Sequence, residues 1–182
     1  MMKITKTAIP EVLVFEPRKF EDERGFFFES FNRRIFNEAV GSNIEFVQDN
    51  HSRSAAGVLR GLHYQIRQSQ GKLVRAIKGA VFDVAVDIRK DSPTLGHWVG
   101  VELTEHNHKQ VWIPVGFAHG FMVLSESADV QYKTSDYYAP KEERCIVWND
   151  KDLGIDWPQI GRSPVLSEKD FKGVSFSDAE LM

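Results

Sequence analysis

The chain has 182 residues, of which 42% are apolar and 12% aromatic, and this is enough to bury the core of one globular domain spanning residues 1–182. The formal net charge of -3 at pH 7 gives no general attraction to nucleic acid or to membrane surfaces, so we expect neither as a partner. An anionic ligand would have to be held by local cations.

The cysteine content and the N-terminal residues predict a cytoplasmic protein. Cys145 is the single cysteine, so no disulfide can form within the chain, which agrees with a reducing compartment. The first residues lack the apolar segment of a signal peptide, and no run approaches the ~20 apolar residues of a membrane span.

Short alternating runs, broken by Gly, Pro, Asn and Asp at intervals of about ten residues, predict an all-β domain. Such a number of strands with almost no helix between them excludes a parallel α/β architecture. In chain order, we expect strands at Val12–Phe15, Phe26–Phe31, Phe46–Gln48, Leu59–Tyr64, Lys72–Lys78, Val81–Arg89, Trp98–Leu103, Val111–Ile113, Phe121–Leu124, Val130–Thr134 and Ile146–Trp148.

The clearest strand is Val81–Arg89, in which apolar residues alternate with Asp83, Ala85 and Asp87. Only Gly79 and Ala80 separate it from the run at Lys72–Lys78. So short a link, with glycine first, predicts that the two runs pair as a hairpin.

Two short, peripheral helices are expected. Residues 32–40 have apolar side chains at helical spacing, with Asn32 placed to cap the helix and Gly41 to end it. Near the C-terminus, Ser177 and Glu180 have the spacing of a capping box.

A cation and an imidazole occur within the core-like run of residues 59–64. Arg60 and His63 would face opposite sides of a regular strand, so if both line one pocket the strand must be irregular at Gly61, most simply through a β-bulge. His119 is the other histidine in apolar company. Either histidine could instead be a hydrogen-bonded residue of the core.

Lys72 also stands at the edge of an apolar run. An unpaired buried ammonium costs several kcal/mol, so Lys72 either belongs to a polar site or points to water from the end of its strand. Tyr132 would be a competent proton donor beside a lysine and a histidine, although aromatic residues there can also serve packing alone.

Arg24 lies in a charged turn at residues 22–25, which could be no more than a hairpin tip. Together with Arg60 it could instead cradle a phosphate or diphosphate, because guanidinium groups bind such anions in a bidentate manner. No glycine-rich phosphate loop is present in the sequence.

We expect no metal. His106 and His108 have the spacing of a ligand pair, yet they lie in polar, turn-like sequence. A zinc or iron site in a β-barrel needs three or more converging ligands, and residues 63–65 lack both a second histidine and a nearby carboxylate.

Five motifs, in order along nearly the whole chain, closely resemble those of dTDP-4-dehydrorhamnose 3,5-epimerases. They lie at residues 22–29, 48–52, 59–65, 71–75 and 114–121. The resemblance implies a cupin-type jelly-roll barrel, a homodimer, and an isomerase of dTDP-rhamnose biosynthesis. Such an enzyme converts a dTDP-sugar, dTDP-4-dehydro-6-deoxy-D-glucose, to dTDP-4-dehydro-L-rhamnose, without metal or cofactor.

The same resemblance implies roles for individual residues. His63 would be the base, Asp170 would orient it, Tyr132 would be the acid, and Lys72 would lie near the sugar ketone. The substrate-binding residues implied are Arg24, Glu29, Gln48, Asp49, Asn50, Arg60, Lys72, His119, Tyr138, Glu143 and Lys169, with Tyr138 stacking on thymine.

The chemistry of the reaction agrees with those residue types. Removing a proton from C3 or C5 gives an enolate whose charge sits largely on the C4 ketone oxygen, which needs a donor such as Lys72. A base must act on one face of the sugar and an acid on the other. Neither an electron nor a hydride moves.

Three alternatives remain. A 3-epimerase or ketoisomerase acting on a related nucleotide sugar would use nearly the same pocket. A metal-dependent cupin oxygenase would carry bound metal. A non-catalytic sugar-binding barrel would keep the cationic cradle but would not need a base, an acid and an oxyanion donor together.

Overall fold

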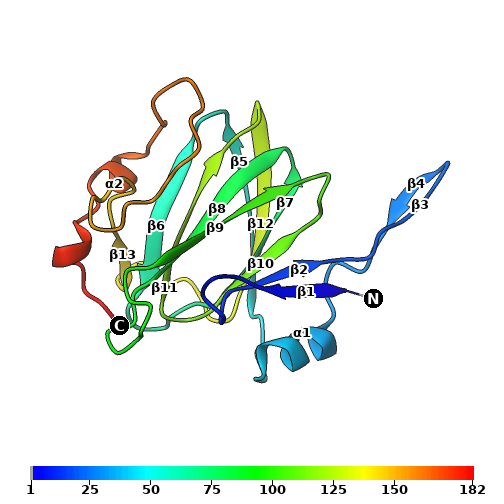
Figure 1. The fold of residues 1–182 in the computed structure, drawn as a ribbon, viewed down its shortest axis with the longest axis horizontal. Coiled ribbons are helices and arrows are strands. Elements are labelled where there is room, and N and C mark those ends of the chain that lie inside the picture. Colours follow the sequence, from blue (N-terminus) through cyan, green and yellow to red (C-terminus); the bar gives the residue numbers. More distant parts are fainter. Residues whose placement is uncertain (1) are drawn as a thin grey trace.

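The computed structural model describes residues 2–182, which form two antiparallel sheets facing each other (Figure 1). The six-stranded sheet contains, in spatial order, β1 (Lys3–Lys6), β2 (Leu13–Glu16), β10 (Gln110–Ile113), β7 (Lys72–Lys78), β12 (Ser127–Thr134) and β5 (Gln48–Ala55). The five-stranded sheet contains β13 (Glu143–Cys145), β6 (Leu59–Gln65), β11 (Phe117–Val123), β8 (Ala80–Asp87) and β9 (Trp98–Thr104). Two such sheets form the predicted cupin-type jelly roll.

The main core lies between the sheets, where inward-facing side chains of both meet. Val74 and Val130 contribute from the six-stranded sheet, and Ala85, Phe117 and Phe121 contribute from the five-stranded sheet. Burial of such side chains is the main favourable term that holds the sheets together.

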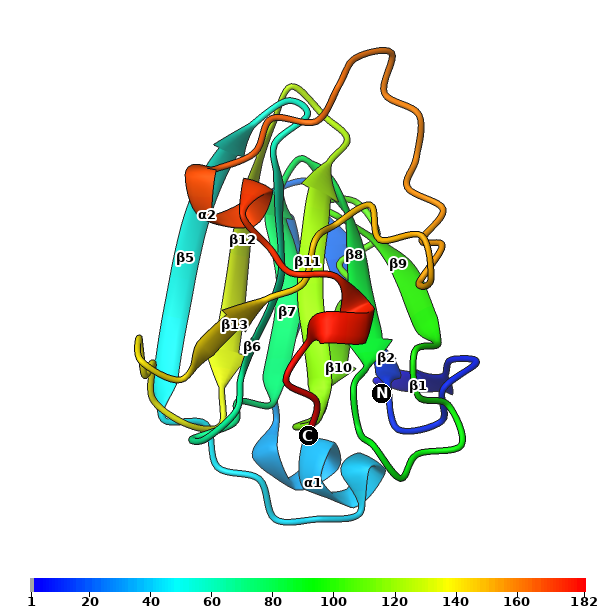
Figure 2. The same ribbon diagram turned by 90° about the vertical axis from the view of Figure 1, so that its left-hand side faces the viewer.

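The predicted alternation of β8 is confirmed, and both of its faces are buried. Val81 and Ala85 face the core between the sheets. Val84 and Val86 pack on the opposite face in a second cluster, together with Trp157. The segment that follows β13 runs across this outer face of the five-stranded sheet (Figure 2).

The first predicted helix is confirmed as α1 (Arg33–Val40). The side chain of Asn32 accepts hydrogen bonds from the backbone N–H groups of Arg34 and Ile35, which satisfies two orphan donors of the first turn. Gly41 ends the helix with φ of 69°. Phe36 buries the apolar face of the helix against the outer side of the six-stranded sheet.

The capping box expected at Ser177 is wrong. Residues Phe176–Asp178 form a 3₁₀ turn, η1, that is capped by Ser175. The capping box lies earlier, where Ser167 and Asp170 bond reciprocally at the start of α2 (Glu168–Phe171). Both segments contain Ser and an acidic residue at suitable spacing, so local sequence does not discriminate between them.

The predicted hairpin between β7 and β8 is also wrong. β7 pairs with β10 and β12, whereas β8 pairs with β11 and β9 in the other sheet. Gly79 therefore lies where the chain crosses between sheets, with φ of +71°, and a Cβ there would lie 2.0 Å from the carbonyl oxygen of Ser127.

Several strand limits also differ from expectation. The strand at Phe26–Phe31 ends at Phe27, because it belongs to a two-stranded hairpin of β3 (Phe20–Asp22) and β4 (Gly25–Phe27). Phe46 packs beside α1 instead of starting β5. Strand β13 precedes the expected Ile146–Trp148, which makes only an isolated bridge.

β1 was not expected from the sequence, and β11 begins earlier than the expected Phe121. Across residues 2–182, no helix has the length and apolar character needed to cross a membrane.

Candidate active site

Strand β6 is irregular at Gly61, as the sequence predicts. On the neighbouring β11, His119 pairs with His63 and Phe121 pairs with Arg60. Gly61 and Leu62 therefore oppose Gly120 alone, which is a β-bulge in β6. Gly61 has φ of +116°, and a Cβ there would lie 2.6 Å from the Cα of Gly120. The bulge lets the side chains of Arg60 and His63 line the same cleft.

That cleft has a volume of about 340 Å³ and contains side chains from both sheets. Ten of the residues singled out in the sequence line it: Gln48, Asn50, Arg60, His63, Lys72, His119, Tyr132, Tyr138, Glu143 and Lys169. Ser52, Gln70, Gly120 and Phe121 line it as well and were not expected from the sequence.

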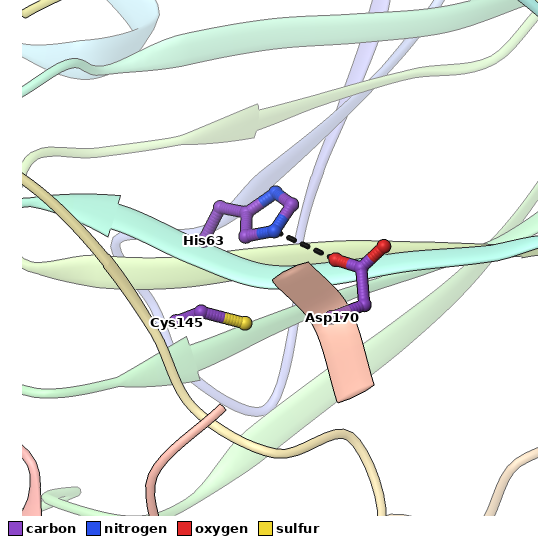
Figure 3. A group of neighbouring side chains, drawn as sticks. All are labelled: His63, Cys145 and Asp170. Carbon is purple, nitrogen blue, oxygen red and sulfur yellow. Dashed lines mark ion pairs between the residues drawn. The ribbon is translucent and has the colours of Figure 1, made fainter. Parts of the chain in front are cut away.

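Asp170 lies next to His63 (Figure 3) and is not among the residues that line the cleft. Its Oδ1 is 2.7 Å from Nε2 of His63, whose side chain is 26% exposed. The backbone N–H of Gly61 donates to the same oxygen, and the hydroxyl of Ser167 donates to Oδ2. Burial acts to raise the pKa of Asp170, but the contacts with His63, Ser167 and Gly61 outweigh it and hold the pKa well below its usual range.

A second His–Asp pair faces the cleft from the five-stranded sheet. Nε2 of His119 is 2.9 Å from Oδ2 of Asp83, and both side chains are almost fully buried. Burial lowers the pKa of His119, and Asp83 opposes that change. Nearby, burial lowers the pKa of Lys72 from 10.5 to about 8, although the charges of Asp83 and Glu143 favour the ammonium.

Tyr132 reaches the cleft from β12, on the sheet opposite His63. Burial raises the pKa of its phenol above the ordinary value, so it is a neutral hydroxyl at pH 7 and able to donate a proton. At the mouth, Glu143 accepts a hydrogen bond from the hydroxyl of Tyr138, at 2.7 Å, and pairs with Lys169.

Three of the expected substrate-binding residues lie outside the cleft. Arg24 pairs with Asp22, with Nη2 2.6 Å from Oδ2, on a hairpin that projects away from the barrel (Figure 1). Glu29 accepts a hydrogen bond from Asn32. Asp49 points to the other face of β5 from the cleft residues and pairs with Lys133 at 3.0 Å. Within one chain, these three side chains do not meet the ligand cleft.

One group of ligating atoms was not expected. His63, Cys145 and Asp170 each offer an atom, and these atoms lie within 4.8 Å of one another (Figure 3). Burial, and then the negative charge of Asp170, raise the pKa of the Cys145 thiol to about 12. The sequence hides this group because its three members lie on β6, β13 and α2.

Comparison with known proteins decides the family. The family model for dTDP-4-dehydrorhamnose 3,5-epimerase matches residues 6–178. A protein of that name from Pseudomonas aeruginosa is 65% identical over 98% of both chains. The chain belongs to the dTDP-4-dehydrorhamnose 3,5-epimerase family and is an isomerase.

Solved structures agree with this family. A 3,5-epimerase from Legionella pneumophila, in complex with dTDP-4-keto-L-rhamnose, is 53% identical, with a TM-score of 0.96, and 99% of this chain and 95% of that chain are covered. A 3′-monoepimerase from Streptomyces bikiniensis, in complex with dTDP-quinovose, is 34% identical with a TM-score of 0.90, and 96% of this chain and 88% of that chain are covered.

Asp83 is the functional candidate that the sequence reasoning missed most clearly. It was assigned to a strand face with Ala85 and Asp87, and that strand is correct. A carboxylate that faces a core needs a partner, so its position on an inward face was the available signal. Its partner, His119, was not identifiable without the pairing of β8 with β11.

Proposed function

We propose that this chain converts dTDP-4-dehydro-6-deoxy-D-glucose to dTDP-4-dehydro-L-rhamnose by proton transfer across a cleft between two sheets. The observation that carries the proposal is that His63 and Tyr132 enter one cleft from opposite sheets. A base on one wall and an acid on the other can remove a proton from one face of the sugar and return one to the other.

His63 is the base in this proposal. Its Nε2 faces Asp170, so Nδ1 is the ring nitrogen left to take the proton. When the imidazolium forms, the carboxylate of Asp170 stabilises it, as the aspartate does in hydrolase triads. Tyr132 then delivers a proton to the opposite face of the carbanion carbon.

Lys72 stabilises the enolate. Abstraction at C3 or C5 places negative charge on the C4 oxygen, and an ammonium in a cleft of reduced polarity stabilises that charge more strongly than it would in water. The positive charge is supplied by the chain itself, so the proposed chemistry requires no metal and no redox cofactor.

Arg60 and the residues at the mouth hold the nucleotide part of the substrate in this proposal. The guanidinium of Arg60 binds the diphosphate, and His119, Gln48 and Asn50 contact the ligand from the cleft walls. Tyr138 stacks on thymine, beside Glu143 and Lys169.

We also propose that the chain is a homodimer in which Arg24 and Glu29 complete the partner's cleft. Arg24 sits on the projecting β3–β4 hairpin, where the side chains of Phe26 and Phe27 are 58% and 72% exposed. An exposed apolar hairpin of this kind is stabilised by pairing with another chain. In a two-fold dimer both hairpins would reach across in the same way.

A cytoplasmic location is also proposed. Cys145 is a free, half-buried thiol, which suits a reducing compartment. Fractionation of the source cells tests this directly.

A 3-epimerase is the second candidate, because the 3′-monoepimerase of Streptomyces bikiniensis superposes closely on this chain. Incubation with dTDP-4-dehydro-6-deoxy-D-glucose in deuterated water, followed by NMR at C3 and C5, distinguishes the two. Exchange at both carbons supports the 3,5-epimerase. Exchange at C3 alone supports the 3-epimerase, and no exchange contradicts both.

A further inference from the structure

Three metal-ligating side chains meet at the back of the cleft. The His63 ring comes from β6, the Cys145 thiol from β13 and the Asp170 carboxylate from α2, and their ligand atoms all lie within 4.8 Å of one another (Figure 3). Cys145 stands directly opposite His63 in the register of β13 on β6. The proposed reaction uses His63 and Asp170 but gives the thiol no part.

The spacing of the three atoms is near that of a zinc site. Zinc binds sulfur at about 2.3 Å and nitrogen or oxygen at about 2.0–2.2 Å, so its tetrahedral ligands lie about 3.2–3.7 Å apart. The thiol already lies within 4.8 Å of the other two atoms. Nε2 of His63 is only 2.7 Å from the Asp170 oxygen, so an ion entering the group would separate that pair by about half an ångström or more.

The ring nitrogen of His63 also lacks a directed partner. Nε2 is a buried atom with no hydrogen bond of acceptable geometry among residues 2–182, although the Asp170 oxygen is close. The contact is therefore close in distance but poorly directed for a hydrogen bond. The thiol of Cys145 makes only a weak contact, at 3.6 Å, with the carbonyl oxygen of Ile146.

We propose that His63, Cys145 and Asp170 form an inhibitory site for a thiophilic divalent cation of the Zn²⁺ or Cd²⁺ class. Nitrogen and sulfur ligands favour these ions over Mg²⁺ and Ca²⁺, which prefer oxygen. The ion replaces the thiol proton, which leaves to solvent, and binds Nε2 of the neutral imidazole, whose single ring proton then sits on Nδ1. It forms one bond each to sulfur, nitrogen and oxygen. The fourth position is left to water.

Occupancy of this site blocks turnover for two reasons. The metal takes the carboxylate away from the imidazole, and its positive charge opposes protonation of the ring. Access is available through the cleft, because the His63 side chain lines it and is 26% exposed. Sulfur is one of the three ligand atoms, so ions that bind sulfur strongly are favoured at the site.

Titration of the full-length protein with Cd²⁺ tests the proposal. One equivalent per chain should produce the ultraviolet absorption of a cadmium–thiolate bond and should abolish epimerisation reversibly, with recovery on adding EDTA. In Cys145→Ser the absorption should disappear. The Zn²⁺ concentration for half-inhibition, measured against the variant's own metal-free rate, should rise by at least about tenfold, since loss of a supporting partner alone costs 10- to 100-fold in affinity.

The matched control is the double variant His106→Ala/His108→Ala, which removes two closely spaced histidines that lie outside the proposed site. It should keep the half-inhibitory concentration of the unmodified protein. Inhibition that disappears in this control, or that survives unchanged in Cys145→Ser, overturns the proposal. A thiolate band without loss of turnover overturns it as well.

If Cys145→Ser does not fold, a measurement on the unmodified protein can still test the proposal. One equivalent of Cd²⁺ should slow alkylation of Cys145 by iodoacetamide, and an unchanged rate contradicts the site. Neither the absorption nor the alkylation depends on the epimerase activity. Failure of the proposed function would therefore leave both results interpretable.

Discussion

The half-buried ammonium of Lys72 is unfavourable for folding and useful for chemistry. Burial lowers its pKa from 10.5 to about 8. Between these two values the unfolded chain binds more protons at this side chain than the folded one, so stability rises with pH across that window. Below about pH 8 the folded protein carries the desolvated charge, and the full penalty is present.

Replacing Lys72 by methionine should therefore stabilise the fold while lowering activity. At pH 7 we expect the free energy of unfolding to rise by on the order of 1–3 kcal/mol, because an apolar chain of similar length replaces a buried charge. The turnover number should fall by about 10²–10³-fold. Urea unfolding and kinetics measure both.

Lys78→Met is the matched control, because Lys78 is exposed at the other end of the same strand. Its stability should change by less than about 0.5 kcal/mol. The stabilisation in Lys72→Met should also fade as the pH rises from about 8 toward 10.5. A Lys72→Met protein that is less stable than the unmodified one at pH 7 would contradict this account.

His63→Ala should abolish turnover while leaving dTDP binding nearly intact, because the proposal assigns the ring to proton transfer and not to nucleotide affinity. Loss of a general base lowers the rate by roughly 10²–10⁴-fold. Steady-state kinetics and calorimetric titration with dTDP measure the two effects. A variant that retains more than about a tenth of the activity would place the base elsewhere.

Chelators should leave turnover unchanged. The proposed mechanism moves protons only, and Lys72 supplies the positive charge at the enolate oxygen, so no metal is asked to act. Prolonged dialysis against EDTA, followed by assay in metal-free buffer, is the measurement. Lost activity that returns on adding a divalent metal would refute the metal-free mechanism.

At the scale of elements, the bulge in β6 decides whether the site exists. Gly61 and Gly120 approach so closely that a Cβ on Gly61 would lie 2.6 Å from the carbonyl oxygen of His119. Without the bulge, Arg60 and His63 would point to opposite faces of the sheet. The position of the bulge was predictable from the sequence. Arg60 and His63 are three residues apart, so a regular strand would place them on opposite faces, and Gly61 lies between them.

Gly61→Ala should accordingly lose both stability and activity. We expect the free energy of unfolding to fall by on the order of 2–4 kcal/mol, because of the positive φ together with the contact with backbone atoms of β11. Gly161→Ala is the control, since Gly161 has φ of +71° but open space around the missing Cβ. The Gly161→Ala substitution should lower the free energy of unfolding by about 1 kcal/mol. If thermal unfolding shows the same loss of stability in both variants, the contact between Gly61 and β11 is not tight.

At the scale of the whole molecule, Arg24 and Glu29 are remote from the cleft of their own chain. The motif at residues 22–29 suggested that both line the ligand site, yet neither lines the cleft, and the β3–β4 hairpin projects away from the barrel (Figure 1). Sharing between two chains reconciles the motif with this geometry. Each site would then combine His63 of one chain with Arg24 of the other.

Mixing inactive chains tests that arrangement. If His63→Ala and Arg24→Ala chains are refolded together in equal amounts, half of the dimers are mixed, and each mixed dimer has one intact site and one doubly damaged site. About a quarter of all sites should regain activity. Each variant refolded alone is the control. If every chain builds its own site, no activity returns on mixing.

The strands, and the chemistry that their side chains can perform, were readable from local sequence. Period-2 alternation reports a backbone conformation directly, so β7 and β8 were located almost to the residue. The capping residues of α1 act within one turn and were equally readable. The side-chain types of His63 and Lys72, together with the five motifs, indicated the family that the comparisons then showed.

Strand pairing, and the contacts between side chains distant in sequence, became apparent only in the folded chain. β7 and β8 are neighbours in sequence but enter different sheets, because pairing is set by burial of both faces of each strand and not by loop length alone. Asp170 and His63 meet although they are more than 100 residues apart in the sequence, and Asp83 meets His119 only through the pairing of β8 with β11. Such contacts arise from long-range packing, which no local pattern encodes.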